Sequence, residues 1–247
     1  MQFVWFTWSL IMLLVWTVIY FLVISARKEM LKTSLWTMPL GLSEPLFVPE
    51  YWKPPSLFNL AEKTGFDIES ILFSFAIGGI GSVLYRIIFP ASQMPVNEFE
   101  KSKLRHKIHR YTLAIPVVIF VLLAFFTNLN HIYCGVIALL SGATSALFCR
   151  PDLKRKIFFG GILFTGLYFI YFSSLRWFYP DYVEKIWKLV NLSGTLFNGI
   201  PLEEFLFAFT FGMFWSSLYE HINWLMLASE KHGKIGETQI AGRHIKN

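Results

Sequence analysis

Long runs of apolar side chains alternate with short polar and basic runs along this chain. A helix crosses the roughly 30 Å hydrocarbon core of a bilayer with about 20 apolar residues, at about 1.5 Å of rise each. Six runs are apolar enough to predict membrane-spanning helices: Phe3–Ile24, Ile68–Phe89, Tyr111–Thr127, His131–Cys149, Ile157–Phe172 and Leu202–Leu227. The fifth run is short for a span, so the pattern leaves its ends loosely defined.

The composition points to the same class of protein. Of 247 residues, 55% are hydrophobic, 18% aromatic and only 15% charged, and the mean hydropathy is +0.50. These values are typical of an integral membrane protein. A cleaved signal peptide is the alternative for Phe3–Ile24, but no basic residue precedes this run and it is long for a signal core. We therefore expect a permanent helix.

Two longer connections separate the predicted helices, Ser25–Gly65 and Ser173–Gly199. The first contains five prolines, and this density argues against a regular helix there. Its segment PLFVPEYWKPPSLF carries tyrosine and tryptophan, which favour the headgroup boundary of a bilayer. For Glu44, Glu50 and Asp181, in these connections, solvent exposure is the first expectation.

Basic residues flank the apolar runs and predict the orientation of the chain. Three groups lie on one side if six helices alternate: Lys101–Arg110, Arg150–Lys156 and Lys231–Lys246. We expect this side to be cytoplasmic in a multi-pass protein of the cell membrane, with both termini inside. Arg27, Lys28 and Lys32 would then lie outside, unless a further crossing lies between Ala26 and Gly65. The same distribution argues against nucleic-acid binding, despite a net charge of +6.

Two segments of the chain are similar to each other. The sequences GFDIESILFSFAIGGIGSVLYR (Gly65–Arg86) and GIPLEEFLFAFTFGMFWSSLYE (Gly199–Glu220) are identical at nine of twenty-two positions. This similarity predicts an all-α polytopic membrane helix bundle of about six transmembrane helices in two related halves. The halves are residues 1–110 and 111–247, which together form one membrane domain. The copies belong to the second and the sixth predicted crossing, which is four crossings later, so both should run in the same direction.

Each copy, taken as a helix, has one face of small residues and another with an acid. The small residues recur at every fourth position, a spacing that favours close helix packing in lipid, and they are Ser74, Gly78 and Ser82, and Ala208, Gly212 and Ser216. On the other face Glu69 shares a stripe with Phe73, and Glu203 shares one with Phe207 and Phe214.

Carboxylic acids at membrane depth are costly and usually serve a function in the interior of a bundle. Neighbouring carboxyl groups in a setting of low dielectric differ in proton affinity, so one can give a proton while another accepts one. Aromatic faces stabilise a nearby cation. We therefore predict proton-initiated carbocation chemistry, with Glu203 and Glu204 as the acid/base pair and Glu69 with Asp67 as a second acidic group. Phe73, Phe207 and Phe214 are the predicted lining for an apolar substrate.

A plainer interpretation of the paired acids stays open. Glu203 and Glu204 follow Pro201, so they could merely occupy the first turn of a helix, where acids interact favourably with the helix dipole. A proton pathway or an inert bundle could share the same pattern.

The segment Asp181–Glu220 resembles the lycopene cyclase domain family of the small, membrane-embedded type. The hallmark of that family is a Pro-x-Glu-Glu/Asp motif that leads into a Phe-rich helix and closes near Tyr-Glu. Here the motif is Pro201 to Glu204, and Tyr219 and Glu220 close it. The first copy looks like a diverged partner that keeps Glu69 but has Asp67 in place of the proline and Ser70 in place of the second acid.

This resemblance implies an isomerase of carotenoid biosynthesis that needs no cofactor. An acid protonates the terminal double bond of a linear carotene, the cation closes a ring, and a base removes a proton. The sequence GGIG at Gly78–Gly81 lies inside an apolar run and is not expected to bind a dinucleotide. Hydration of carotenoid ends, and a non-catalytic carrier or scaffold, remain alternatives. The resemblance leaves the ring type, the number of ends cyclised, the proton donor and the oligomeric state open.

The remaining candidate residues give weaker signals. His106 and His109 lie in a basic run, where a solvated loop is favoured over a metal site. Cys134 and Cys149 have no C-x-x-C spacing, so neither a disulfide framework nor a zinc site is predicted from them. Arg86 and Glu220 occupy equivalent positions in the two copies and could form an ion pair.

Overall fold

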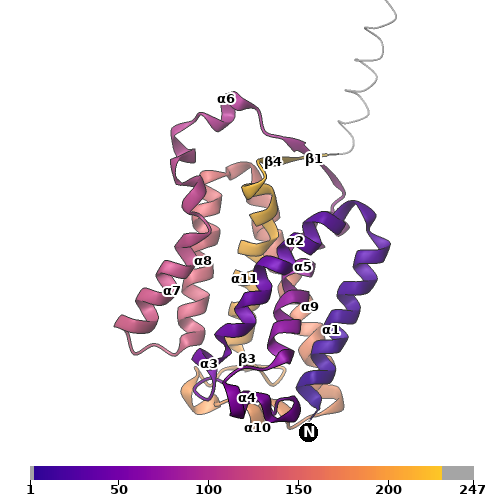
Figure 1. Cartoon of the computed structure of the whole chain (residues 1–247), viewed down its shortest axis with the longest axis vertical. Coiled ribbons are helices and arrows are strands. Elements are labelled where there is room, and N and C mark those ends of the chain that lie inside the picture. The colour runs from indigo at the N-terminus through magenta and orange to yellow at the C-terminus, as the bar shows by residue number, and fades with distance from the viewer. Residues whose placement is uncertain (1–2, 230–247) are drawn as a thin grey trace, which may run out of the picture.

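The computed structural model of the chain describes residues 3–229. Long helices lie side by side along one axis, and short helices and turns close both ends (Figure 1). The α-helices are α1 Val4–Leu22, α2 Arg27–Thr37, α3 Glu44–Phe47, α4 Leu60–Thr64, α5 Ile68–Ile88, α6 Glu98–Lys101, α7 Ala114–Phe126, α8 His131–Cys149, α9 Lys154–Phe178, α10 Tyr182–Ile186 and α11 Leu202–Ile222.

Short elements join these helices. The 3₁₀ turns are η1 Ile24–Ala26, η2 Met38–Ser43, η3 Leu57–Asn59, η4 Leu104–Tyr111, η5 Pro151–Leu153 and η6 Leu189–Asn191. Two small antiparallel sheets pair β1 Ala91–Pro95 with β4 Leu225–Ser229, and β2 Leu196–Phe197 with β3 Ile200–Pro201. Helix is therefore the dominant structure of the described residues, as predicted.

Four segments in residues 3–229 are long and apolar enough to cross a membrane: Val4–Leu22, Ile68–Ile88, His131–Cys149 and Pro151–Phe178. A fifth crossing is available if η4 and α7, which meet at a bend of 61°, count as one broken span. These segments coincide with five of the six predicted runs. The sixth run coincides with α11, which has 21 residues but contains Glu203, Glu204 and Glu220 and is not among the candidate spans.

Several predicted boundaries were wrong, and charged residues explain the largest error. The fifth run was placed at Ile157–Phe172, whereas α9 has 25 residues and includes Lys156, whose charge is paired inside the protein. Helix α7 has only 13 residues, about 20 Å at 1.5 Å each, which is short of the hydrocarbon thickness. Helix α11 ends at Ile222, and the end of the predicted run forms β4 instead.

The first connection is more regular than its prolines indicated. It begins with the helix α2, which ends before Pro39, the first proline of the connection. The expectation of no regular helix there was therefore wrong for its first part, because proline limits a helix only at and just before its own position.

Helix α2 and the turn η2 run antiparallel to α5 and return the chain from one end of the bundle to the other (Figure 1). Glu29 of α2 contacts Arg86 near the end of α5, Ser34 and Thr37 lie against its middle, and Gly41 lies against its start. The first connection thus forms a segment that crosses the length of the bundle and packs along α5.

Three of the six predicted small residues, Gly78, Gly212 and Ser216, pack closely against other helices, whereas Ser74 lines the cavity described below. Gly78 lies against Thr37 of α2, and a Cβ placed there would collide with that side chain. A Cβ at Gly212 would lie 2.6 Å from the carbonyl oxygen of Gly160 in α9. Ser216 donates a hydrogen bond to the carbonyl oxygen of Lys156 at 3.1 Å. These contacts bring the backbones of α5 and α2, and of α11 and α9, close together.

Helices α5 and α11 run in the same direction, so their acidic N-terminal ends lie at one end of the bundle and their C-terminal ends at the other (Figure 1). At the C-terminal end five buried or half-buried side chains form a group, which we call the charge cluster: Glu29, Arg86, Gln93, Lys156 and Glu220. Lys156 Nζ lies 2.8 Å from Glu29 and 2.6 Å from Glu220, and Arg86 lies 2.6 Å from Glu29. Gln93 donates to both glutamates, at 2.9 and 2.8 Å.

The suggested ion pair between Arg86 and Glu220 is replaced by this network. Each of the two residues has an oppositely charged partner, Glu29 for Arg86 and Lys156 for Glu220, and no direct pair between them is recorded in residues 3–229. Glu29 comes from α2, which the sequence did not predict as a helix, so its carboxylate could not be considered as the partner.

Candidate functional site

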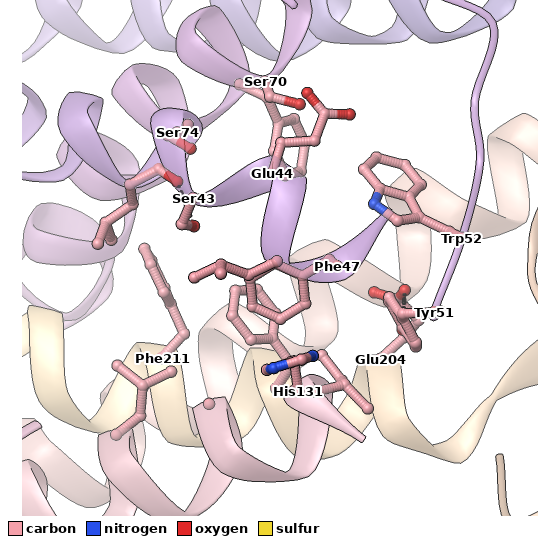
Figure 2. Close-up of a pocket in the computed structure, with 18 of the residues that line it drawn as sticks. Ser43, Glu44, Phe47, Tyr51, Trp52, Ser70, Ser74, His131, Glu204 and Phe211 are labelled. Carbon is pink, nitrogen blue, oxygen red and sulfur yellow. Dashed lines mark hydrogen bonds between the residues drawn. The ribbon is translucent and has the colours of Figure 1, made fainter. Parts of the chain in front are cut away.

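A large apolar cavity of about 540 Å³ lies between the acidic ends of α5 and α11. Its walls come from η2, α3, α5, α7, α8, α9 and α11, together with the loop around Tyr51 and Trp52 and with Trp5 of α1. Figure 2 shows Glu44 and Glu204 on this wall, together with the rings of Phe47 and Phe211. Volumes of this order are usual for cavities that hold small molecules.

Glu204 reaches the cavity from the first turn of α11. Its side chain is buried and accepts a hydrogen bond from Trp187 Nε1 at 2.7 Å and a further one from the Tyr51 hydroxyl. Both donors are neutral, so they orient the carboxylate without neutralising its charge. Burial, and then the nearby Glu204 charge, raise the pKa of Tyr51 well above its usual value, so this hydroxyl stays protonated and donates.

Glu44 of α3 is a second acid on the cavity wall, and no sequence pattern pointed to it. It is only 5% exposed, and neither of its carboxyl oxygens has a hydrogen-bond partner within residues 3–229. Burial, and then the charge of Asp67, raise its pKa to about 9. Glu44 therefore carries a proton at neutral pH, and the expectation of solvent exposure was wrong for it.

The other predicted acids lie next to the cavity but do not line it. Glu203 is buried and accepts hydrogen bonds from the Tyr133 hydroxyl at 2.6 Å and the Ser193 N–H at 2.8 Å. Glu69 accepts from the Leu57 N–H at 2.6 Å. Asp67 caps α5 by accepting from the N–H of Ser70, at 2.5 Å. Of the four predicted acids, only Glu204 faces the cavity.

The predicted aromatic lining is present in part. Phe73 and Phe207 line the cavity, whereas Phe214 does not and instead packs beside Gly142 of α8. The structure adds rings from outside the two related segments: Trp5, Trp52, Tyr168, Tyr171, Phe172 and Trp187. Trp5 and Trp52 meet edge to face with centroids 4.8 Å apart. Aromatic side chains therefore form much of the wall of the cavity that the two acids also line.

One side of the cavity is formed by residues that are also exposed on the outer surface. Val117 and Phe125 of α7 are 62% and 81% exposed, and Leu46 of α3 is 44% exposed. No lysine or arginine is among the cavity-lining residues. The cavity is therefore bordered by an exposed apolar surface between α3 and α7.

Comparison with known proteins identifies one family. Residues 130–222, from the start of α8 to the end of α11, match the family model described as lycopene cyclase. This range includes Pro201, Glu203 and Glu204, so the resemblance to the lycopene cyclase domain family is confirmed for that part of the chain. No curated protein and no solved structure matches the chain.

Proposed function

We propose that this protein is a lycopene-cyclase-type isomerase that closes a ring at the end of a linear carotene. The observation that carries the proposal is the pair of Glu44 and Glu204 on the wall of one aromatic cavity without a lysine or arginine. The match of residues 130–222 to the lycopene cyclase family supports the substrate class.

The two acids differ in a way that suggests separate roles. Glu44 holds a proton and has no hydrogen-bond partner within the described residues, so it is the candidate donor to the terminal C=C bond. Glu204, held by Tyr51 and Trp187, is the candidate base. Glu203, in the same turn of α11, is proposed to position Glu204. Asp67 and Glu69 lie close to Glu44.

The reaction balances with these two groups alone. Protonation of the terminal double bond gives a tertiary cation, and the neighbouring double bond attacks it and closes the ring. Loss of one proton to Glu204 then leaves a cyclic alkene, an isomer of the substrate. Return of that proton to Glu44 resets the site, so no oxidant or reductant is required. The rings of Phe73, Tyr168 and Phe207 would stabilise the cation without supplying a nucleophilic amine or thiolate.

The substrate would enter from the bilayer rather than from water. The exposed apolar residues between α3 and α7 form a lateral opening that suits a long hydrocarbon chain. One end group would occupy the cavity while the polyene extends toward lipid.

We propose that the charge cluster marks the cytoplasmic end of a multi-pass bundle. The basic groups Arg27–Lys32, Lys101–Arg110 and Arg150–Lys156 lie in segments at this end (Figure 1), which suits the positive-inside rule. The sequence pattern placed Arg27, Lys28 and Lys32 outside, away from the other basic groups. Because α2 and η2 cross the bundle once more, these three residues lie at the same end as the other basic groups. The N-terminus then lies on the opposite side, whereas the count of six alternating helices predicted it inside. The predicted basic group at Lys231–Lys246 lies outside the described residues.

The two-halved organisation stays a proposal in a modified form. Each half contains three segments that run along the bundle in the same order and directions (Figure 1). In residues 1–110 they are α1, α2 with η2, and α5, and in residues 111–247 they are α8, α9 and α11. Helix α7 would then connect the halves. The parallel course of α5 and α11, with small residues packed against α2 and α9, supports this arrangement.

The test is expression of the full chain in cells that accumulate lycopene, followed by chromatography of the extracted pigments. We expect a cyclic product that is absent from cells with an empty vector. Unchanged lycopene in cells that contain well-folded protein would refute the proposal. A hydroxylated acyclic product would instead indicate that water captures the cation, as in carotenoid hydration.

A further inference from the structure

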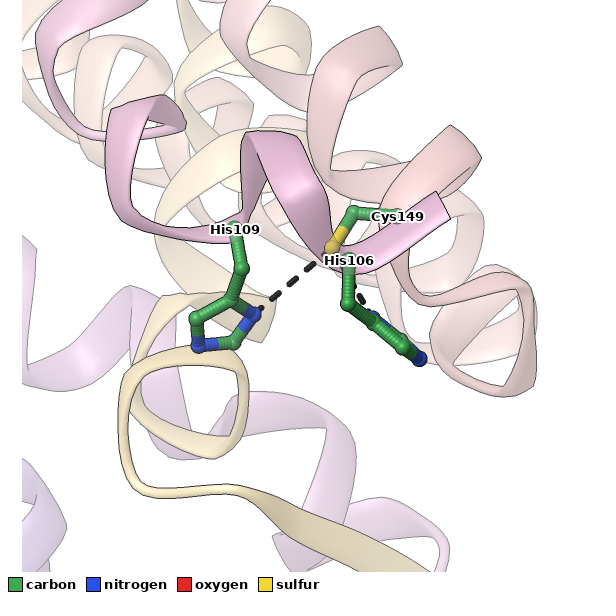
Figure 3. A group of neighbouring side chains, drawn as sticks. All are labelled: His106, His109 and Cys149. Carbon is green, nitrogen blue, oxygen red and sulfur yellow. Dashed lines mark hydrogen bonds between the residues drawn. The ribbon is translucent and has the colours of Figure 1, made fainter. Parts of the chain in front are cut away.

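A group of metal-ligand side chains lies at the end of the bundle opposite the apolar cavity. His106 and His109 of η4 and Cys149 at the end of α8 meet there, and one potential ligand atom of each lies within 4.8 Å of the others (Figure 3). His106 is 7% exposed and Cys149 is fully buried. The expectation that His106 lies in a solvated loop was therefore wrong.

Both distances from a histidine nitrogen to the cysteine sulfur match a known coordination geometry. His106 Nδ1 lies 3.3 Å from Cys149 Sγ, and His109 Nδ1 lies 3.6 Å from the same sulfur. In a tetrahedral zinc site with Zn–N and Zn–S bonds of about 2.0 and 2.3 Å, the nitrogen and sulfur ligands are about 3.5 Å apart. Both histidines thus point a ring nitrogen at one sulfur from the distance that a shared zinc ion would require.

The surroundings of the two imidazoles fix their orientation. The His109 ring stacks on Trp224 with centroids 3.7 Å apart and on His221 at 4.1 Å. The other nitrogen of His106, Nε2, faces a carboxylate oxygen of Glu100 at 3.7 Å, slightly beyond hydrogen-bond distance, and has no other hydrogen-bond partner among the described residues. Ligand histidines in metal sites commonly turn their second nitrogen toward a carboxylate, which fixes the tautomer and strengthens the ligand.

Two arginines near the group are paired with acids. Arg150 donates to Asp152 at 2.6 Å, and Arg105 contacts Glu100. These acids reduce the repulsion that the two arginines would exert on a bound cation. The Cys149 thiol would lose its proton to solvent on binding, and the thiolate with two neutral imidazoles would offset part of the ion's charge.

We propose that His106, His109 and Cys149 bind a zinc-type divalent ion, with water in the fourth position. The ion would join η4 to the end of α8. Because η4 leads directly into α7, which forms one wall of the apolar cavity, the ion would fix the start of that wall from outside the cavity. The proposal does not depend on the reaction assigned to the cavity.

Titration of the purified full chain in detergent with Co²⁺ tests this site. The visible absorption of Co²⁺ depends on its ligands and geometry, whereas Zn²⁺ has no visible absorption. We expect one Co²⁺ per chain, a thiolate-to-cobalt charge-transfer band and the intense visible bands of a tetrahedral ion, all removed by added Zn²⁺. A wild-type spectrum without the charge-transfer band would overturn the proposal, and this measurement needs no variant.

Variants assign the ligands. Cys149→Ser should remove the charge-transfer band, whereas Cys134→Ser, at the other buried cysteine of α8, should keep it. His106→Gln should lose the tetrahedral spectrum, and His131→Gln, at the far end of α8, should not. Glu100→Gln should weaken Co²⁺ binding about tenfold through the orientation of His106. The same band in both cysteine variants would also overturn the proposal.

Discussion

The apolar cavity and the charge cluster both bury two glutamates, yet the two regions treat them differently. In the charge cluster, Glu29 and Glu220 share Lys156, and Arg86 contacts Glu29 as well. In the cavity, Glu204 accepts only from neutral donors, and the lining residues include no lysine or arginine. A buried carboxylate paired with a cation contributes to structure, whereas one without a cation keeps its capacity to give or take a proton.

The comparison also separates the two ends of the bundle by role. The charge cluster ties together α2, α5, α9 and α11 and the strand β1 at one end. The cavity lies at the other end, between η2, α5, α7, α8, α9 and α11. Catalytic change at one end should therefore be separable from loss of stability at the other.

The largest expected effect is on turnover, from Glu204→Gln. The amide keeps the shape of the side chain but cannot accept a proton as a carboxylate does, so the base is lost. We expect cyclic product to fall by about 10²- to 10⁴-fold, with the yield of folded protein unchanged. Pigment analysis per unit of purified protein measures this.

The matched control for that variant is Glu220→Gln in the charge cluster. It should lower the yield or thermal stability of the protein while product per folded molecule stays within a few-fold of the original. The reverse pattern, with turnover lost in the cluster and kept in the cavity, would contradict the division of roles.

The next effect is on stability, from Lys156→Met. The substitution leaves Glu29 and Glu220 buried without the cation that they share, and removal of one partner from a buried ion pair costs about 3–5 kcal/mol. Thermal unfolding in detergent measures this loss. Lys154→Met, at an exposed position two residues earlier in the same helix, is the control and should change the midpoint little. Equal effects of the two variants would show that the cluster contributes no special stability.

A smaller effect concerns pH and the acid Glu44. Its pKa of about 9 is raised above its usual value, so the acid is loaded at neutral pH and loses its proton as the pH rises through about 9. Cyclisation by the purified protein should therefore be steady near neutral pH and fall about tenfold per pH unit above that point, because only the protonated form donates. Glu44→Asp should retain more activity than Glu44→Gln. A rate that stays constant up to pH 10 would remove Glu44 from the role of donor.

The related segments and the acid Glu204 could be found from the sequence because each has a local signal. Apolar runs of sufficient length located α1, α5 and α8, and the Pro-x-Glu-Glu motif located Glu204. Glu44 had no such signal: it lies in a proline-containing connection, beside Pro45, and becomes buried only because η2 packs Gly41 against the start of α5. Non-local packing of this kind does not leave a periodic pattern.

The paired charges of the cluster also could not be predicted from sequence spacing. Lys156 was counted as a flanking basic residue, and its place inside α9 depends on Glu29, which is 127 positions earlier in the chain. The cysteine and histidines near η4 also lie about 40 positions apart. Sequence spacing predicts sites built from one turn of helix, but these groups are assembled from different helices.

The smallest expected effect on turnover comes from the two tyrosines that donate hydrogen bonds to the two glutamates of the motif. Tyr51 donates to Glu204, which lines the cavity, and Tyr133 donates to Glu203, which does not. Tyr51→Phe removes a hydrogen bond to a carboxylate, an interaction usually worth about 1.5–3 kcal/mol, so turnover should fall about tenfold with little change in KM for the carotene. Tyr133→Phe makes the same chemical change one residue away in the motif and should lower turnover less. If Tyr133→Phe has the larger effect on turnover, Glu203 rather than Glu204 is the base.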